Sequence, residues 1–407
     1  MSGGNYNPAV SVALVVRGAL PANDGLAYVA AQLLGAFGAG AFASQLAGAS
    51  SSFATAGMIG HPAVAPTSSL LSAVLAEIII TFALCFVVLH TATTSFAKGK
   101  SYYGLAIGFT VVSGAISVGS ISGGAFNPAV SMLNLVAGDT SAIWVYWLGP
   151  LLGGALAGAL FRLTHPDEVD SSVDKPIYTD LIVEFIGTFL LGFTVACAAA
   201  PSNASGLAPL SIGAMLMAVV YAGGPTSGGH YNPAVTLAVF LRSTVFDKGD
   251  GLSAAKAGAY VLIQLVAGLV AAFAGCMVVG EIGFPAPADG VPLGLVWCVE
   301  ALATFLLAFV VLQSATSSET DGNSFFGLAI GFAVLAMAVA IGGISGGALN
   351  PAVGLLGLMN GATTSSIAIY ITACPAGAVL AALAFRVTNS KEFEATEVMG
   401  EHVYNKA

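Results

Sequence analysis

Ser2-Gly-Gly-Asn-Tyr-Asn-Pro-Ala-Val10 is a phrase that this chain repeats three more times. The later copies read Ser-Gly-Gly-Ala-Phe-Asn-Pro-Ala-Val at 122–130, Ser-Gly-Gly-His-Tyr-Asn-Pro-Ala-Val at 227–235 and Ser-Gly-Gly-Ala-Leu-Asn-Pro-Ala-Val at 345–353. Each copy joins a Gly-rich turn to Asn, Pro and about ten mostly apolar residues. This order predicts a helix start, because Asn caps the first turn and Pro loses no hydrogen bond at the first position.

The helices that these phrases start are too short to cross a bilayer. Ten residues rise roughly 15 Å, about half of a hydrocarbon core that is about 30 Å thick. We therefore predict four half-helices that meet in pairs, tip to tip, at the middle of the membrane. Their Asn-Pro-Ala boxes are Asn7, Pro8, Ala9, Asn127, Pro128, Ala129, Asn232, Pro233, Ala234, Asn350, Pro351 and Ala352.

The composition is that of a membrane protein. Of the 407 residues, 57% are hydrophobic and only 8% are charged, whereas a soluble domain carries about 25% charged residues. The net charge of −9 argues against a nucleic-acid partner. We predict a multi-pass protein of the plasma membrane or of an intracellular membrane, with lipid as its surroundings.

Ten further apolar segments have the length of a transmembrane helix. The predicted fold is therefore an all-α polytopic membrane protein with ten full spans and four half-spans. The predicted spans are Leu26–Leu46, Leu71–Thr91, Tyr103–Gly119, Ile143–Leu163, Leu181–Ala199, Leu207–Gly223, Ala255–Val279, Leu293–Leu312, Phe325–Ile341 and Ile367–Phe385.

The repeat is nested, which predicts two related units in tandem. Asn232 follows Asn7 by 225 residues, and Asn350 follows Asn127 by 223. Two predicted spans precede Asn232 in its unit, but only six residues precede Asn7. We interpret the first unit as a truncated copy that lacks its first two helices. The predicted parts are a partial unit at 1–165, an acidic linker at 166–177, a complete unit at 178–390 and a cytoplasmic tail at 391–407.

The basic residues predict the orientation of the spans, because Lys and Arg favour the cytoplasmic side. With Arg17 in the cytoplasm, threading the spans places all eleven basic residues on one side. They are Arg17, Lys98, Lys100, Arg162, Lys175, Arg242, Lys248, Lys256, Arg386, Lys391 and Lys406. The sequon Asn203-Ala-Ser205 falls on the opposite side, as glycosylation would need.

The paired half-helices predict a pore for uncharged molecules. Two helix N-termini that meet place two positive dipole ends, each about half a charge, at one point. Asn amides that face this point add N–H donors. A water molecule held there by its oxygen cannot pass a proton along the file, and a cation meets a positive barrier.

These motifs together resemble the aquaporin (major intrinsic protein) family. The resemblance lies in the paired Asn-Pro-Ala boxes, the Glu-x-x-x-Thr spans, the Tyr-Val-x-x-Gln span that starts at Tyr28 and again at Tyr260, and Tyr146-Trp-Leu-Gly-Pro150. It implies a right-handed bundle of six tilted helices and two half-helices per pore. It also implies assembly as a homo-tetramer, or as a pseudo-tetramer of units, and passive flow of small neutral solutes.

The expected selectivity filter departs from the family pattern. Where aquaporins usually carry Arg after the second Asn-Pro-Ala, this chain has Val130 and Val353. Counting from the motifs places the other filter positions at Ile212, Ala338 and Gly347 in the complete unit and at Ala115 and Gly124 in the partial one. We expect a wide, apolar filter that repels cations weakly outside the midplane.

Three carboxylates and one histidine near the motifs have two interpretations each. Glu77, Glu184 and Glu300 lie within spans, where a carboxylate often belongs to a proton relay; the resemblance implies instead that they brace the half-helix loops. His230 stands two residues before Asn232. It either gates the pore by protonation or makes a simple hydrogen bond at the pore mouth.

We predict a passive channel for water and other small neutral solutes such as glycerol or urea. The alternative is a non-conducting adhesive or scaffolding membrane protein that keeps the fold. We predict no enzyme activity, because no Ser/His/Asp or metal cluster lies near a cavity, and no cofactor or metal. The cysteines lie singly in apolar stretches and are expected to pack in the core: Cys85, Cys197, Cys276, Cys298 and Cys374.

Overall fold

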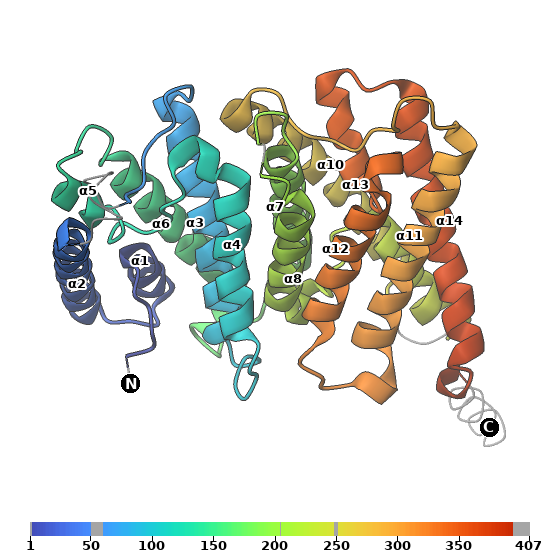
Figure 1. Ribbon diagram of the computed structural model, residues 1–407. Helices are drawn as coiled ribbons and strands as arrows, with labels where there is room; N and C mark the ends of the chain where they lie inside the picture. The colour runs from blue at the N-terminus through green and yellow to red at the C-terminus, as the bar shows by residue number, and fades with distance from the viewer. Residues whose placement is uncertain (1, 50–59, 204, 248–250, 394–407) are drawn as a thin grey trace. The chain divides into compact units, whose positions relative to one another are not determined.

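The computed structural model describes residues 2–49, 60–203, 205–247 and 251–393, and it divides into two compact units (Figure 1). Within these ranges the chain is helical, with connecting loops and no strand. Ten of the described helices are long and apolar enough to cross a membrane, and each coincides with one predicted span. The predicted all-α, multi-pass membrane fold is therefore confirmed.

Unit 1 comprises Met1–Thr179 together with Met277–Gly280. Its half-helix α1 is followed by a long helix, and four further helices complete the unit. They are α1 (Pro8–Arg17), α2 (Ala22–Ala49), α3 (Leu70–Ala92), α4 (Tyr103–Ser122), α5 (Met132–Ala137) and α6 (Val145–Thr164).

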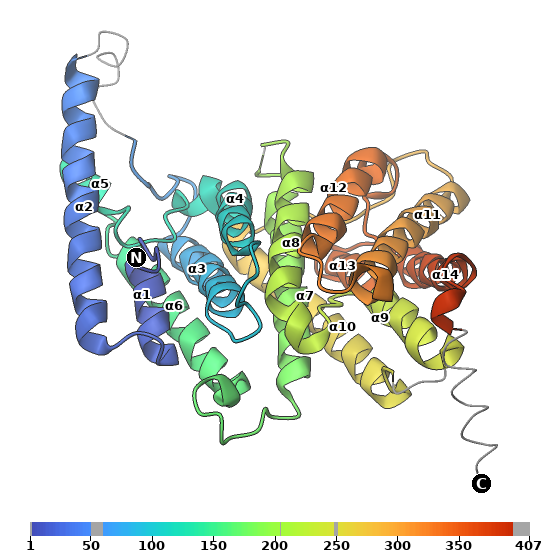
Figure 2. The ribbon, with the colours of Figure 1, turned by 90° about the horizontal axis from the view of Figure 1, so that it is seen from below.

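Unit 2 comprises Asp180–Cys276 and Glu281–Ala407. Its described residues form six long helices and two short ones, and Figure 2 shows the short helix α13 among the long helices. The helices are α7 (Thr179–Ala198), α8 (Ala208–Ser227), α9 (Pro233–Phe240), α10 (Ala254–Val279), α11 (Leu293–Val311), α12 (Phe326–Ser345), α13 (Pro351–Gly354) and α14 (Thr364–Thr388). A π-helical stretch, Leu241–Phe246, extends α9, and a 3-10 stretch, Leu355–Asn360, extends α13.

The predicted domain boundaries stay a prediction, although the two units divide near them. The division falls between Thr179 and Asp180, so that residues 166–177 group with unit 1. Most of the predicted tail, 394–407, lies outside the described residues, as do Lys248 and Lys406 of the predicted basic set.

Three of the four half-helices begin where the sequence predicts. The side chains of Asn7, Asn232 and Asn350 cap α1, α9 and α13, and Pro occupies the first helical position in each. The prediction of a half-helix directly after Asn127 is wrong. Residues 128–131 form successive tight turns, and α5 begins only at Met132 and has six residues.

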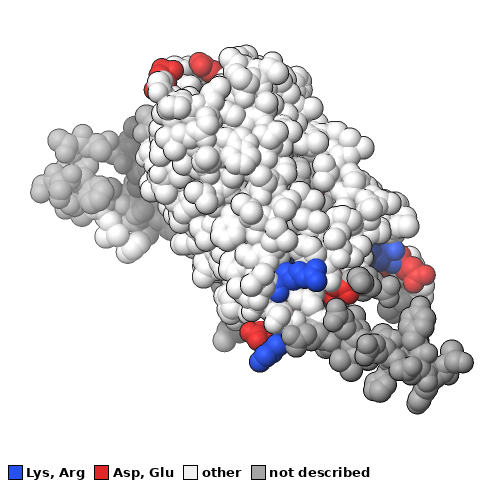
Figure 3. Space-filling model, turned by 90° about the vertical axis from the view of Figure 1, so that its right-hand side faces the viewer, with Lys and Arg blue, Asp and Glu red and all other residues white. Residues whose placement is uncertain are grey.

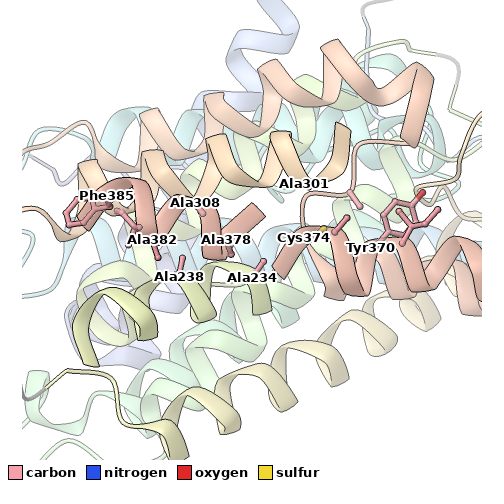
Figure 4. Close-up of a cluster of buried hydrophobic side chains, with 14 of the residues drawn as sticks. Ala234, Ala238, Ala301, Ala308, Tyr370, Cys374, Ala378, Ala382 and Phe385 are labelled. Carbon is pink, nitrogen blue, oxygen red and sulfur yellow. The ribbon is translucent and has the colours of Figure 1, made fainter. Parts of the chain in front are cut away.

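Small side chains let the helices of unit 2 pack closely. The cluster in Figure 4 joins α9, α11 and α14 largely through alanines. Its labelled members are Ala234, Ala238, Ala301, Ala308, Tyr370, Cys374, Ala378, Ala382 and Phe385. Without a hydrophobic driving force between helices in lipid, such small residues allow the close approach that van der Waals packing requires.

The surface of unit 2 has the charge pattern of a membrane protein. Figure 3 shows a broad face with no charged atoms in its middle, and Lys and Arg atoms at only one of its margins. Three cysteines are buried as predicted, namely Cys85, Cys197 and Cys374. Cys298 is exposed on the apolar surface, so its expected place in the core is wrong.

Candidate functional site

In unit 2 the N-termini of α9 and α13 meet through their two Asn side chains. The Asn232 amide donates from Nδ2 to the carbonyl of Leu349 at 2.8 Å, and Asn350 donates to that of Tyr231 at 2.9 Å. Each Oδ1 meanwhile accepts the amide of its own helix's second residue. Since an amide has two N–H hydrogens, each Asn keeps one hydrogen for a molecule in the cavity beside it.

The backbone before each Asn makes this exchange of hydrogen bonds possible. Tyr6, Phe126, Tyr231 and Leu349 have φ values of 47°, 49°, 50° and 51°, in the left-handed region that non-Gly residues rarely adopt. This conformation turns each carbonyl toward the Asn of the opposite loop. Such strain persists only where surrounding contacts determine it, and it is common at functional sites.

A cavity passes beside the two Asn residues of unit 2. The cavity has an empty volume of ≈ 930 Å³, which includes open solvent space next to it. It brings together both Asn amides and all four filter positions expected for this unit: Asn232, Asn350, Ile212, Ala338, Gly347 and Val353. None of the described residues that line this cavity is charged, and most are aliphatic.

Glu184 in α7 accepts four hydrogen bonds from the turn that leads into α9. Its Oε1 accepts from the Ser227 hydroxyl at 2.7 Å and from the His230 amide at 2.9 Å. Its Oε2 accepts from the Tyr231 amide at 2.7 Å and from Gln264 Nε2 at 2.8 Å. Both oxygens therefore act as acceptors, and the four bonds tie the turn and Gln264 to α7.

Glu77 and Glu300 make the same kind of contacts with the other loops. Glu77 accepts from the hydroxyl of Ser122 and from the amides of Ala125 and Phe126 at 2.7–2.9 Å. The Glu300 carboxylate accepts from Ser345, Ala348 and Leu349 at 2.6–2.9 Å. All three carboxylates are fully buried.

His230 lines the cavity with its ring fixed by two neighbours. Its Nδ1 lies 3.1 Å from the hydroxyl of Thr236, and the ring meets Tyr260 edge-on at 5.4 Å between centroids. These contacts hold the imidazole within unit 2 at the edge of the cavity.

Unit 1 contains the same cross-loop bonds but an incomplete site. Asn7 donates to the carbonyl of Phe126 at 2.8 Å, and Asn127 donates to that of Tyr6 at 3.1 Å. The cavity beside them is lined by Asn127 and Val130, but not by the expected filter residues Ala115 and Gly124. Ala115 is exposed instead.

The structure gives some residues at the site a role that the sequence analysis did not assign. The hydroxyls of Tyr146, Tyr260 and Tyr370 donate to the carbonyls of Ser122, Ser227 and Ser345, and so tie a span to the Gly-rich turn in three of the four copies. Phe284 and Pro285, from the loop before α11, also line the cavity of unit 2. Tyr146 and Tyr260 stand in motifs that carry the family resemblance, but those motifs do not indicate the hydrogen bonds to the Ser carbonyls.

Membrane-length helices around half-helices that meet N-terminus to N-terminus beside a cavity define a polytopic membrane protein with a channel-like site. The chain belongs to the major intrinsic protein family, whose model matches residues 1–161 and 171–385. Members of this family are channels and not enzymes, in agreement with the prediction that this chain has no enzyme activity.

Several relatives match parts of the chain. It is 34% identical over 223 residues to the glycerol uptake facilitator protein-like 6 of Lactiplantibacillus plantarum, covering 52% of this chain and 98% of that protein. It is 43% identical over 165 residues to aquaporin TIP2-1 of Zea mays and 41% to a probable TIP-type aquaporin of Antirrhinum majus, covering 40% of this chain each time. The chain spans 62% of the length of these two plant relatives.

Proposed function

We propose that the protein is a passive membrane channel for water and small neutral solutes such as glycerol or urea, and that unit 2 forms the pore. The observation that carries this proposal is the single cavity that contains both Asn amides and the four apolar filter positions. Relatives named as aquaporins and as a glycerol uptake facilitator protein support the solute class.

The chemistry of the cavity fits solutes without charge. The half-helix N-termini direct positive dipole ends to the two Asn residues, and each amide keeps one N–H for an oxygen of water or of a hydroxyl. The aliphatic wall offers little to replace the hydration of an ion. With Val353 where the family usually has Arg, a neutral solute larger than water meets no charged constriction.

The experiment that tests this proposal uses the full chain in proteoliposomes and stopped-flow light scattering. An impermeant osmolyte reports water flux by the rate of vesicle shrinkage, and glycerol or urea reports solute entry by re-swelling. We expect shrinkage faster than that of protein-free vesicles, followed by re-swelling. Equal rates with and without folded protein would refute the channel.

The buried carboxylates are proposed to brace the half-helix loops rather than to relay protons. Glu77, Glu184 and Glu300 each accept several hydrogen bonds from the loop beside them. A relay needs a group that exchanges its proton with the pore. Glu184 and Glu300 do not line the described cavity of unit 2, and Glu77 does not line that of unit 1. A flux of solute without accompanying proton flux would agree with this role.

We also propose that the chain is a tandem of a partial and a complete channel unit, with the boundaries given above, and that it assembles as a homo-tetramer or a pseudo-tetramer of units. The recurring caps, cross-loop bonds and braced turns support the tandem arrangement. Light scattering of the detergent-solubilised protein measures the number of chains per particle.

A second candidate function is a non-conducting scaffold of the same fold. The cavity of unit 1 is not lined by the expected filter residue Ala115, which is exposed, and this favours the scaffold for that unit alone. If blocking the cavity of unit 2 abolishes conduction, unit 2 is the conducting unit. The role of a non-conducting scaffold then remains for unit 1 only.

A further inference from the structure

An arginine ties the far end of half-helix α9 to two spans of unit 2. Arg242 stands in the π-helical stretch that extends α9. It donates from Nη2 to the carbonyl of Thr316, beyond α11, at 2.9 Å and to the carboxylate of Glu392, beyond α14, at 2.7 Å. Glu392 also accepts the amide of Ser318 at 3.0 Å. The guanidinium lies 5.6 Å from the centroid of the Phe385 ring, which belongs to α14.

Unit 1 contains the same set of contacts, and we call such a set of five residues a clamp. Arg17, the last residue of α1, donates to the carbonyl of Thr93 at 2.7 Å. Its Nη2 lies 3.9 Å from the carboxylate of Glu168, and its guanidinium lies 4.6 Å from the centroid of the Phe161 ring. Glu168 accepts the amide of Ser95 at 2.9 Å. Each of these residues precedes its counterpart in unit 2 by 223–225 positions, so the clamp belongs to the repeat.

The two clamps differ in the pair of side chains beside them. In unit 2, Nε2 of Gln313 donates to Oδ1 of Asn389 at 2.9 Å, and Nδ2 of Asn389 donates back to Oε1 of Gln313 at 3.2 Å. The same positions in unit 1 hold His90 and His165. The two imidazole rings meet edge to face with 4.9 Å between centroids, and both contact the ring of Phe161. Unit 1 therefore has two titratable groups where unit 2 has two amides.

The contacts of His90 show where its proton lies. Its Nδ1 is 2.8 Å from the carbonyl of Phe86, which can only accept, so Nδ1 carries the hydrogen. Its Nε2 is then a bare acceptor, buried without a hydrogen-bond partner among the described residues. A second proton would turn Nε2 into a buried N–H donor that lacks an acceptor, beside the ring of His165. The packing therefore suits the uncharged pair only.

Charged groups of both signs surround this pair. Arg17 in α1 and Lys175 in the loop after α6 oppose a positive charge on either imidazole. Burial, followed by the charge of Lys175, lowers the pKa of His165, which lies outside the spans, to about 4 from the usual 6.5. Asp167 and Glu168 act in the opposite direction but do not prevail. A released His takes up a proton below pH 6.5 and the clamped one does not, so a falling pH favours release.

We propose that the clamp of unit 1 is an acid-operated latch, in which protonation of the His90–His165 pair releases the turn Pro166–Glu168 from the end of α1. Phe161 contacts both imidazoles and the Arg17 guanidinium. A positive charge on the pair therefore repels Arg17 across a single ring, in a buried setting where charges interact more strongly than in water. The turn that carries the carboxylate partner of Arg17 then separates from α1.

The clamp of unit 2 does not respond in the same pH range. Its amide pair gains no proton where imidazole titrates. The ion pair of Arg242 and Glu392 is also closer, at 2.7 Å. Arg17 and Glu168 are 3.9 Å apart. Acid therefore frees one end of half-helix α1 and leaves the corresponding end of α9 held.

Amide hydrogen exchange of the full chain in lipid nanodiscs, at pH 7.5 and at pH 5, tests the latch. Residues 165–169, whose amides donate to carbonyls of the same turn and of α6, are the unit 1 reporter. Residues 389–393, at the corresponding positions, are the unit 2 reporter. Each rate is divided by the rate of an unstructured peptide at the same pH, because intrinsic exchange itself depends on pH. The ratio gives the protection of each reporter.

We expect the protection of the unit 1 reporter to fall about tenfold or more between pH 7.5 and pH 5, and that of the unit 2 reporter to change less than about twofold. Exchanging the pairs between the units tests the cause. His90→Gln with His165→Asn should keep the unit 1 reporter protected at pH 5. Gln313→His with Asn389→His should make the unit 2 reporter sensitive to acid. His61→Gln is the matched control, because His61 lies in unit 1 outside the clamp, and it should lose protection as the parent does.

Four results would overturn the proposal. Equal protection of the unit 1 reporter at both pH values would show that its clamp does not respond to acid. A loss that persists with the amide pair in unit 1 would show that other groups, such as Asp167 or Glu168, titrate instead. A unit 2 reporter that stays protected with the imidazole pair would show that this pair does not decide acid sensitivity. Equal losses in both reporters of the parent would show general loosening of the chain rather than a latch in unit 1.

Discussion

The substitution Glu184→Gln isolates the contribution of one carboxylate to the folded unit. Gln has the same shape as Glu but replaces one acceptor oxygen with an NH₂ donor. Each oxygen of Glu184 accepts two hydrogen bonds, from Ser227 and His230 or from Tyr231 and Gln264. Whichever way the amide points, two buried donors lose their acceptor and face another donor.

The expected loss of stability follows from these two donors. A buried donor without an acceptor costs about 1–3 kcal/mol, so Glu184→Gln should lower the free energy of unfolding by roughly 2–6 kcal/mol. That is a large part of the roughly 5–15 kcal/mol that holds a typical protein folded. The volume is unchanged, so the loss comes from hydrogen bonding and not from a cavity.

The assay is reversible unfolding of the full chain in mixed micelles, titrated with a denaturing detergent and followed by circular dichroism. Glu281→Gln is the matched control, because Glu281 lies in the same unit but is exposed in a loop. Its unfolding free energy should stay within about 0.5 kcal/mol of the parent. A Glu184→Gln protein as stable as this control would refute the bracing role.

Two further substitutions test the pore and a polar contact outside the spans. Val353→Arg puts a charged side chain on the cavity wall. It should slow the re-swelling of vesicles in glycerol and urea about tenfold while water flux continues. Unchanged solute flux would show that the filter is assigned wrongly. Glu392 lies outside the spans, where burial opposes its ionisation but hydrogen bonds from Ser317 and Arg242 prevail and lower its pKa below the usual 4.5. A lowered pKa contributes stability above pH 4.5 that is lost as the pH falls through the folded value. Glu392→Gln should therefore destabilise the protein at pH 7, and its thermal unfolding temperature should fall less steeply than that of the parent as the pH is lowered. If the unfolding temperatures of parent and variant depend equally on pH, this role of Glu392 is contradicted.

The sequence was informative wherever local chemistry decides the structure. Asn followed by Pro predicts a capped helix, and the caps at Asn7, Asn232 and Asn350 form as expected. The Asn350 cap also sets the register of α13, which places Val353 on the wall of the cavity.

In the copy of the motif at Asn127, a side-chain hydrogen bond competes with the helix start that Asn-Pro predicts. Ala129 donates its amide to the Asn127 side chain, as a cap requires, at 2.9 Å. However, the Ser131 hydroxyl donates to the carbonyl of Pro128 at 2.7 Å. Such a bond back to the preceding turn competes with helix formation, and the helix begins only at Met132.

The cross-loop bonds could not be predicted, because their cause lies far away in the chain. Tyr231 adopts a positive φ that its residue type disfavours. The compensating donor is Asn350, 119 residues later, whose amide meets the carbonyl of Tyr231. Helix propensity and hydrophobic periodicity depend on residues that are close together in the sequence. They therefore cannot predict this hydrogen-bond partner.

The central claim is that solutes cross the membrane through the cavity of unit 2. A matched pair of tryptophan substitutions tests it most directly, because Ala338 lines that cavity whereas Ala115, at the corresponding position of unit 1, is exposed. In stopped-flow measurements on proteoliposomes that hold equal amounts of folded full-length protein, Ala338→Trp should reduce water and glycerol flux to the level of empty vesicles, and Ala115→Trp should leave both unchanged. Undiminished flux through Ala338→Trp would contradict the account.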